Sequence, residues 1–238
     1  MTFETATTET TSTDPVAPYR IQAVAFDLDG LIFNTEAVFN RTLTDLLARR
    51  GKPAPPELFA AMMGLRAKEA HGVMSRMMEI DEPLETLQAE TSELFQHHLE
   101  DLLAPMPGVA ELLAHLEATG RPKCVCTSSG RDYALGLLRR YDWHERFEFV
   151  LGAEDVTNGK PHPEVYATAI DRLGSRPNRT MVLEDSSHGV AAGSAAGAFT
   201  VGVPHEHTRG QSHEAASLVA DTLADPRLYD TLSERGVH

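Results

Sequence analysis

Short runs of apolar residues alternate along most of the chain with segments in which apolar side chains recur at about every third or fourth position. The first pattern is typical of strands, and the second is typical of helices that pack on one face. The predicted strands are residues 22–27, 123–128, 147–152, 180–185 and 198–203. The predicted helices between them are residues 108–119, 132–141, 163–173 and 189–196. Because the strands are apolar on both faces, the pattern predicts an α/β fold with a parallel sheet between two layers of helices.

Residues 35–104 interrupt this alternation, because they contain helical patterns and no convincing strand. The clearest helical pattern comes last, where five large apolar side chains fall largely on one stripe: Leu84, Leu87, Phe95, Leu99 and Leu102. Pro105 and Pro107 then stiffen the return of the chain toward the sheet. The pattern predicts a helical module inserted after the first strand.

Composition limits the classes of protein that the chain can belong to. Its 238 residues, of which 42% are hydrophobic, suit one sizeable domain or a core with an inserted module. The 35 acidic residues outnumber the 21 basic ones, and no basic tract could follow the phosphates of a nucleic acid. No apolar run reaches the roughly 18 residues of a membrane-spanning helix, and no signal-peptide pattern opens the chain. We therefore predict a cytoplasmic protein that binds neither nucleic acid nor membranes, with a disordered, threonine-rich tail at residues 1–18.

Cysteines and histidines do not indicate a zinc site. Cys124 and Cys126 lie two residues apart in a predicted strand, so they share a face and are expected to pack as reduced, buried side chains. His205, His207 and His213 are expected to lie on a polar surface loop.

Two aspartates end the first apolar run. Asp27 and Asp29 are one residue apart, and Gly30 follows them. Paired carboxylates at the end of a buried strand cost free energy unless a cation or a reacting group compensates them. We therefore expect a positively charged group at this point.

Other polar side chains stand at comparable places in the predicted sheet. Thr127 and Ser128 end the second strand, Glu184 and Asp185 end the fourth, and Lys160 lies in the loop after the third. Because ligands of parallel α/β sheets bind at the carboxyl ends of the strands, these groups are expected to converge on one crevice. Each motif alone is common in turns and helix caps, so their shared position carries the prediction.

This set of side chains suits phosphoryl transfer through a covalent aspartyl-phosphate. Asp27 can attack phosphorus once a cation and a lysine offset the repulsion between the two anionic groups. Asp29 can protonate the leaving oxygen and later accept a proton from water. Thr127 and Ser128 can hold the non-bridging oxygens, and Asp185 can bind Mg²⁺ together with Asp27.

Four stretches, in this order, resemble the haloacid dehalogenase (HAD) superfamily, whose members are mostly phosphatases and phosphomutases: FDLDGLIFNTE, CTSSG, GKPHPEVY and LEDSSHGVAAGSAAG. The resemblance covers about residues 21–203, and it includes the helical insert, which is similar to the cap domain of that family. It implies a Rossmann-like catalytic core formed by residues 19–34 and 105–238. The cap domain would be residues 35–104.

The same resemblance implies a role for each of the polar residues. Asp27 would be the nucleophile and Asp29 the acid and base. Thr127 and Lys160 would bind the phosphate. The magnesium site would consist of Asp27, Asp185 and the backbone oxygen of Asp29, with support through water from Glu184.

Within the superfamily, the chain is most similar to the group of beta-phosphoglucomutase and small sugar-phosphate phosphatases. Phe39 stands where that mutase has a histidine, and Ala67 stands where it has a cap arginine, with Arg66 one residue earlier. Both departures favour a phosphatase over the alternative of a beta-phosphoglucomutase-type phosphomutase. Asn34 stands at a cap-hinge position where the family often has Asp, and it would tune either closure or substrate fit.

The substrate-binding candidates are Arg66 and Asn34 together with Thr127, Ser128 and Lys160. Lys68 and His71 share helical spacing with Arg66, but they are expected on a solvated helix face.

The prediction is a magnesium-dependent phosphatase of a small phosphorylated metabolite, a sugar phosphate, acting as a monomer. A silent relative would lack the nucleophile or the acid, and a dehalogenase would need neither Asp29 as an acid nor Asp185 as a metal ligand.

Overall fold

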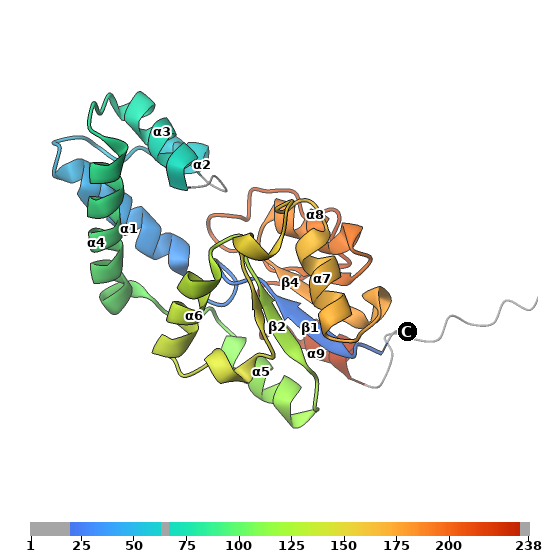
Figure 1. Ribbon diagram of the computed structural model, residues 1–238. Coiled ribbons are helices and arrows are strands. Elements are labelled where there is room, and N and C mark those ends of the chain that lie inside the picture. Colours follow the sequence, from blue (N-terminus) through green and yellow to red (C-terminus); the bar gives the residue numbers. More distant parts are fainter. Residues whose placement is uncertain (1–19, 63–66, 234–238) are drawn as a thin grey trace, which may run out of the picture.

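The structure, a computed structural model, describes residues 20–62 and 67–233. Within these residues, parallel strands form one six-stranded sheet in the order β3-β2-β1-β4-β5-β6 (Figure 1). The strands are β1 (Ala23–Phe26), β2 (Lys123–Cys126), β3 (Val150–Leu151), β4 (Thr180–Glu184), β5 (Phe199–Gly202) and β6 (Leu218–Val219). The prediction of an α/β fold with a parallel sheet is confirmed. The predicted tail, residues 1–18, lies outside the described residues.

Each predicted strand is present but shorter than its apolar run, and the edge strand β6 was not predicted. The run at residues 147–152 yields only the two residues of β3, because its first half approaches the sheet as a loop. There Phe147 packs edge-on against Phe26, with ring centroids 5.7 Å apart. Strand β6 is also two residues long, which is too short to give a periodic pattern.

Helices cover both faces of the sheet. Helices α5 (Val109–Ala118), α6 (Arg131–Arg140) and α9 (Pro226–Leu232) pack on one face, and α7 (Glu164–Arg172) and α8 (Ser187–Ala195) pack on the other (Figure 1). Along β1, Val24 and Phe26 belong to the first of these cores and Ala25 belongs to the second. Alternating side chains therefore enter two separate apolar layers, which is why the strand is apolar throughout. Single turns of 3-10 helix occur at His144–Arg146, Ala153–Asp155 and Pro177–Arg179.

The segment after β1 folds into helices that lie to one side of the sheet (Figure 1). They are α1 (Thr35–Ala48), α2 (Pro56–Met62), α3 (Ala67–Met78) and α4 (Leu84–Leu102). These helices have an apolar core of their own, which includes Leu46, Leu58, Met74 and Leu87. The stripe predicted for α4 is only partly confirmed, because Leu87 and Leu99 are buried whereas Leu102 is 38% exposed.

Two connections join the helical segment to the sheet, and they run beside each other. Phe33 forms a β-bridge with Pro105, and the amide of Met106 donates to the carbonyl of Ile32 at 2.9 Å. These bonds bring both connections to the carboxyl end of β1. The helices are thus held over the edge of the sheet at which parallel α/β proteins bind ligands.

Cys124 and Cys126 are confirmed as free thiols that point to the same face of β2. Both are buried, and their Sγ atoms lie 3.9 Å apart in the core beneath α7 and α8. None of the described helices combines the length and the apolar character that a membrane span requires.

Candidate active site

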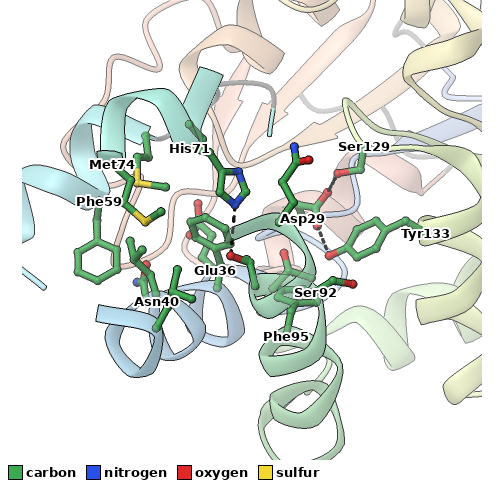
Figure 2. A pocket seen from close by; sticks show the side chains of 18 of the residues that line it. Asp29, Glu36, Asn40, Phe59, His71, Met74, Ser92, Phe95, Ser129 and Tyr133 are labelled. Carbon is green, nitrogen blue, oxygen red and sulfur yellow. Dashed lines mark hydrogen bonds between the residues drawn. The ribbon is translucent and has the colours of Figure 1, made fainter. Parts of the chain in front are cut away.

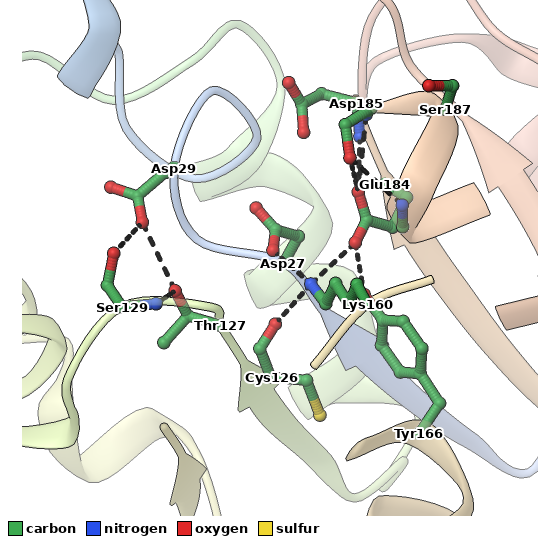
Figure 3. A network of polar contacts seen from close by, with 12 residues as sticks. Asp27, Asp29, Cys126, Thr127, Ser129, Lys160, Tyr166, Glu184, Asp185 and Ser187 are labelled. Carbon is green, nitrogen blue, oxygen red and sulfur yellow. Dashed lines mark hydrogen bonds and ion pairs between the residues drawn. The ribbon is translucent and has the colours of Figure 1, made fainter. Parts of the chain in front are cut away.

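The register of the central strands brings polar side chains from distant parts of the chain to one edge. Phe26 pairs with Val125 of β2 and with Leu183 of β4, so the next residue along each strand lies at the same level. Asp27 therefore lies beside Glu184, the last residue of β4. Figure 3 shows the resulting network at the carboxyl ends of β1, β2 and β4. The convergence that the sequence predicted for these strand ends is present.

Lys160 links the two central carboxylates. Its Nζ atom donates to Oδ1 of Asp27 at 2.5 Å, to Oε1 of Glu184 at 2.6 Å and to the carbonyl of Cys126 at 2.9 Å. The side chain is only 6% exposed. Burial alone would lower the pKa of Lys160, but the charges of Asp27 and Glu184 outweigh it and hold the pKa above its ordinary value. The ammonium group therefore stays charged at this site.

Glu184 is completely buried and has partners on both carboxylate oxygens. Oε1 accepts from Lys160 and from the hydroxyl of Tyr166 at 2.6 Å, and Oε2 accepts from the hydroxyl of Ser186 at 3.2 Å. A Cβ atom at Gly189 would lie 1.8 Å from Cδ of Glu184. A glycine in the first turn of α8 is therefore needed for Glu184 to occupy this position.

The carboxylates around Lys160 form a donor set for a hard cation. Ligand atoms of Asp27, Glu184 and Asp185 all lie within 4.8 Å of one another. Burial raises the pKa of Asp27 well above its ordinary value; Lys160 opposes this rise, whereas Glu184 and Asp185 add to it. Burial also raises the pKa of Asp185, to about 6. Three buried carboxylates with one ammonium leave uncompensated negative charge, and a divalent cation bound by oxygen ligands fits that arrangement.

Asp29 lies on the other side of Asp27 from Glu184, and hydroxyl groups hold its side chain (Figure 3). Oδ2 accepts from Ser129 at 2.8 Å and from Thr127 at 3.2 Å, and Oδ1 accepts from the hydroxyl of Tyr133 at 3.3 Å. Thr127 also accepts from the backbone amide of Ser129 at 2.9 Å. Burial and the charge of Asp29 raise the pKa of Tyr133, so its hydroxyl stays protonated and donates. The arrangement fixes the orientation of the Asp29 carboxylate.

Sequence reasoning did not identify Ser129 or Tyr133 as site residues. Ser129 is part of the TSSG motif, so its position after β2 was a usable signal. Tyr133 lies in the first turn of α6, and nothing in the local sequence distinguishes it from a core tyrosine.

His205 lies on the loop after β5, as expected, but its side chain turns into the site, which was not expected. Its Nε2 atom lies 3.0 Å from Oδ2 of Asp185 and 3.0 Å from Oε2 of Glu36, at the start of α1. Burial would lower the pKa of His205, but its bonds to Asp185 and Glu36 raise it to about 9. The loop after β5 folds back over the site, and a Cβ atom at Gly30 would lie 2.6 Å from His205. Gly30, with a φ of 80°, therefore allows both the turn and this close approach.

The other two histidines of that loop also have partners. His213 places Nε2 2.7 Å from the backbone oxygen of Asp185, and His207 places Nε2 3.4 Å from Nδ2 of Asn40. Ligand atoms of Glu36, Asp185 and His205 lie within 4.8 Å of one another, so this loop adds a second group of side chains able to bind a metal beside the first.

Asn34 belongs to the connections between sheet and helices. Its side chain donates to the carbonyl of Leu102 at 3.1 Å and accepts from the amide of Ala104 at 2.7 Å, and its own amide donates to the carbonyl of Ala104 at 3.0 Å. Of the two roles that the sequence allowed for Asn34, these contacts favour the hinge. They do not favour contact with substrate, because both polar atoms of the side chain are already bonded to the second connection.

The remaining candidates lie in or near the helical segment. Arg66 lies outside the described residues. Lys68 is exposed, as expected, but His71 is only 8% exposed, and its Nε2 atom lies 3.2 Å from the hydroxyl of Thr91. The expected solvated face is therefore wrong for His71, because α3 turns this residue toward α4.

A cavity of about 770 Å³ lies between the helical segment and the strand ends. Asp29, Ser128, Ser129 and Tyr133 line it on the side of the sheet, and His207 lines it from the loop after β5. Side chains of α1 to α4 line the other sides. Figure 2 shows Asp29 and Tyr133 at one end, Phe59 and Met74 at the other, and His71 between them. The cavity therefore connects the carboxylate of Asp29 with the interior of the helical segment.

The structure combines a parallel α/β core with a crevice of carboxylates at the strand ends, and the comparisons give the family of the chain. Residues 24–203 match the family described as haloacid dehalogenase-like hydrolase. The chain belongs to this family, as its motifs predicted. It is 31% identical over 201 residues to a phosphorylated carbohydrates phosphatase from Thermotoga maritima. The alignment covers 84% of this chain and 93% of that protein.

A second relative supports this family, and a solved structure has the same fold. It is 29% identical over 216 residues to an N-acetylmuramic acid 6-phosphate phosphatase from Pseudomonas aeruginosa. This alignment covers 90% of this chain and 95% of that protein. Its fold is similar to that of a beta-phosphoglucomutase from Clostridium difficile, with a TM-score of 0.70, 21% identity, and coverage of 89% and 97% of the two chains. The predicted group of beta-phosphoglucomutase-like and sugar-phosphate phosphatase proteins is confirmed. Both relatives are named as phosphatases, which supports a phosphatase rather than a mutase for this chain.

Proposed function

We propose that the chain is a magnesium-dependent phosphatase that hydrolyses the phosphate monoester of a small metabolite through an aspartyl-phosphate on Asp27. Sugar phosphates and related compounds are the substrate class, because the carbohydrate phosphatase of Thermotoga maritima spans most of this chain. The observation that carries the proposal is the position of the Lys160 ammonium group, bonded to Asp27 and Glu184 beside the carboxylate of Asp185. That the protein is cytoplasmic and that it is a monomer both stay predictions.

In the first half of the reaction, a carboxylate oxygen of Asp27 forms a bond to phosphorus while the bond from phosphorus to the leaving oxygen breaks. Lys160 holds the attacking carboxylate through Oδ1. Asp29, which must hold a proton for this step, gives it to the leaving oxygen, which departs as an alcohol. The phosphoryl group is then covalently attached to Asp27, and Asp29 is a carboxylate.

In the second half, Asp29 accepts a proton from a water molecule whose oxygen attacks the phosphorus. The bond between phosphorus and Asp27 breaks, inorganic phosphate leaves, and both side chains return to their starting states. Mg²⁺ bound by Asp27, Asp185 and the backbone oxygen of Asp29, with Glu184 behind them, would supply the positive charge that offsets repulsion between carboxylate and phosphate.

The hydroxyl of Thr127 has two possible partners in this scheme. Without substrate it donates to Asp29, and with substrate it would donate to a phosphate oxygen together with Ser128 and Lys160. Ser129 and Tyr133 would continue to hold Asp29 after Thr127 changes partner. We assign Ser129 and Tyr133 as positioning residues for the acid and base.

Release of inorganic phosphate from a panel of phosphorylated metabolites tests this function. We expect hydrolysis of several sugar phosphates with Mg²⁺ and loss of hydrolysis in excess chelator, restored when Mg²⁺ is added back. Full turnover in excess chelator would contradict the proposed role of the cation.

A beta-phosphoglucomutase-type phosphomutase is the alternative, since the solved mutase has a similar fold. A mutase must hold a second phosphate away from the nucleophile. The described residues that line the cavity include no lysine or arginine, but Arg66 lies outside the described residues. The phosphatases among the relatives support the phosphatase. Incubation with beta-glucose 1-phosphate, Mg²⁺ and a trace of glucose 1,6-bisphosphate separates the two. Faster formation of glucose 6-phosphate than of inorganic phosphate would favour the mutase.

A further inference from the structure

Large apolar side chains wall the end of the cavity that lies deepest in the helical segment. They come from α1, α2 and α3 and include Phe39, Leu43, Leu46, Phe59, Met62 and Met74. Figure 2 shows Phe59 and Met74 beside each other at this end. Phenyl faces and methionine thioethers pack well against flat or cyclic groups, and covering them removes apolar surface from water. This lining favours a ligand that itself has an apolar face.

The opposite end of the cavity begins at the acid and base candidate. Asp29 lines it, and Tyr133, which donates to Asp29, has its ring centroid 6.1 Å from that of Phe95 on α4. A substrate with its phosphate between Asp27 and Asp29 would therefore extend past Tyr133 and Phe95 into the apolar part. The leaving group of the substrate would therefore occupy the same cavity that the apolar side chains line.

The polar groups in the lining of the helical segment are mostly uncharged. Gln88, Thr91, Ser92 and Gln96 of α4 contribute amides and hydroxyls. In the part of the chain that the structure describes, no lysine or arginine lines the cavity. Amide and hydroxyl groups of this kind can donate to and accept from the hydroxyl groups of an uncharged ligand. The described part of the lining accordingly suits leaving groups that are uncharged.

The volume of the cavity exceeds what a phosphate group needs. At about 770 Å³ it corresponds to on the order of 25 water molecules of about 30 Å³ each. This lies within the range of about 300–1,000 Å³ that holds drug-sized ligands. A leaving group of that size can fill the space from Asp29 to Met74.

We propose that the leaving group of the substrate carries an uncharged ring with an apolar face, which packs between α1, α2 and α3. This proposal rests on the phosphatase function proposed above and narrows it. The substrate class becomes phosphate monoesters of ring-bearing alcohols. A sugar phosphate belongs to this class when an uncharged ring with an apolar face is attached to its sugar.

Two sugar phosphates that differ only in their aglycone test the proposal. Methyl β-glucopyranoside 6-phosphate and phenyl β-glucopyranoside 6-phosphate share the same phosphorylated primary alcohol, so their leaving oxygens are matched. With Mg²⁺ we expect kcat/KM to be about 10- to 100-fold higher for the phenyl compound, because only its ring is buried in the cavity. Equal values, or a preference for the methyl compound, would overturn the proposal.

Variants on the wall of the cavity locate the preference. Phe59→Ala is expected to reduce the phenyl-over-methyl ratio at least about fivefold, because it removes a ring from the apolar end. Met77→Ala is the matched control, since Met77 lies on α3 near Met74 but is 45% exposed. Should Phe59→Ala fail to fold, Phe39→Ala on α1 tests the same wall. A wild-type ratio in a folded wall variant would contradict the assignment.

Calorimetric binding of the two esters to Asp27→Asn separates this proposal from the phosphatase function. One outcome is that the variant binds the phenyl ester about tenfold more tightly than the methyl ester while the wild type hydrolyses neither ester. That result would support the cavity assignment and contradict the phosphatase. Hydrolysis of both esters by the wild type at equal kcat/KM, with equal binding to the variant, would support the phosphatase and contradict the cavity assignment.

Discussion

The strand-end site and the cavity beside it share Asp29 but are built from different interactions. At the strand ends, charged and polar groups are paired at 2.5–3.3 Å around Lys160 and Asp29. In the cavity, the deep wall consists of apolar side chains from three helices. The first region depends on sheet register, because a shift of one residue would turn Asp27 away from Glu184. The second depends on how the helices pack.

This difference separates chemistry from selectivity. The groups that we assign to bond breaking stand within three residues of a strand end or, for Lys160, in the loop between β3 and α7. The groups that we assign to recognition are spread over α1 to α4 and can change without moving the strands. Substitutions at the strand ends should therefore affect turnover of every substrate, and substitutions in the cavity should affect the choice among substrates.

Asp27→Asn should give the largest effect. The amide is a poor nucleophile, so we expect kcat to fall by roughly 10⁴-fold or more for every substrate tested. Binding of the ring-bearing ester should persist, because the apolar wall is unchanged. Asp171→Asn, an exposed aspartate on α7, is the matched control in the phosphate-release assay. Turnover by Asp27→Asn at a rate near wild type would break the distinction between the two regions.

Asp29→Ala should reduce kcat by about 10²–10⁴-fold, because it removes proton transfer to the leaving oxygen and from water. Stopped-flow measurement of the first turnover and of the steady state shows which half is slowed. The reduction should be smaller for an ester whose leaving group needs no proton, such as p-nitrophenyl phosphate. An equal reduction for both esters in the first turnover would point to another acid.

Tyr133→Phe tests a residue that belongs to both regions. The change removes the hydroxyl bond to Asp29 at 3.3 Å and keeps the ring beside Phe95. We expect kcat to fall about 3- to 10-fold with KM nearly unchanged, as the loss of one hydrogen bond predicts. Tyr229→Phe on α9 is the control. An increase in KM with unchanged kcat would assign Tyr133 to substrate binding alone.

Asn34→Ala should have the smallest effect on chemistry, because it changes the connection between the two regions. It removes two side-chain hydrogen bonds to the second connection, and we expect the free energy of unfolding to fall by about 1–2 kcal/mol. Asn34→Asp keeps an acceptor for Ala104 but loses the donor to Leu102, so its loss should be intermediate. Urea unfolding measures both, and unchanged stability in Asn34→Ala would show that these bonds are dispensable.

The parts of the fold that were predictable are those with a local signal. The central strands are buried on both faces, so their apolar runs stood out, whereas the two-residue strand β6 left no periodic pattern. The stripe of α4 was only partly right, because Leu94 and His98 turn inward while Leu102 is exposed. Helix packing against α1 decides these positions, and it depends on residues about 50 positions away in the sequence.

The candidate site divides in the same way. Asp27, Asp29, Thr127 and Glu184 were predictable because each stands at the end of an apolar run, and sheet topology does the rest. His205 was not predictable, because its partners are more than 160 residues before it, at Glu36, and 20 residues before it, at Asp185. Long-range loop packing has no signature in a single sequence.

An aspartyl-phosphate on Asp27 can be trapped on the protein and located. We would mix the enzyme with ³²P-labelled substrate and Mg²⁺, quench in acid within milliseconds, and locate the label by mass spectrometry. We expect a hydroxylamine-sensitive acyl phosphate on Asp27, which accumulates further in Asp29→Ala when the leaving group is p-nitrophenol, because that variant slows attack by water. Label on any other residue, or none on Asp27 while phosphate is being released, would contradict it.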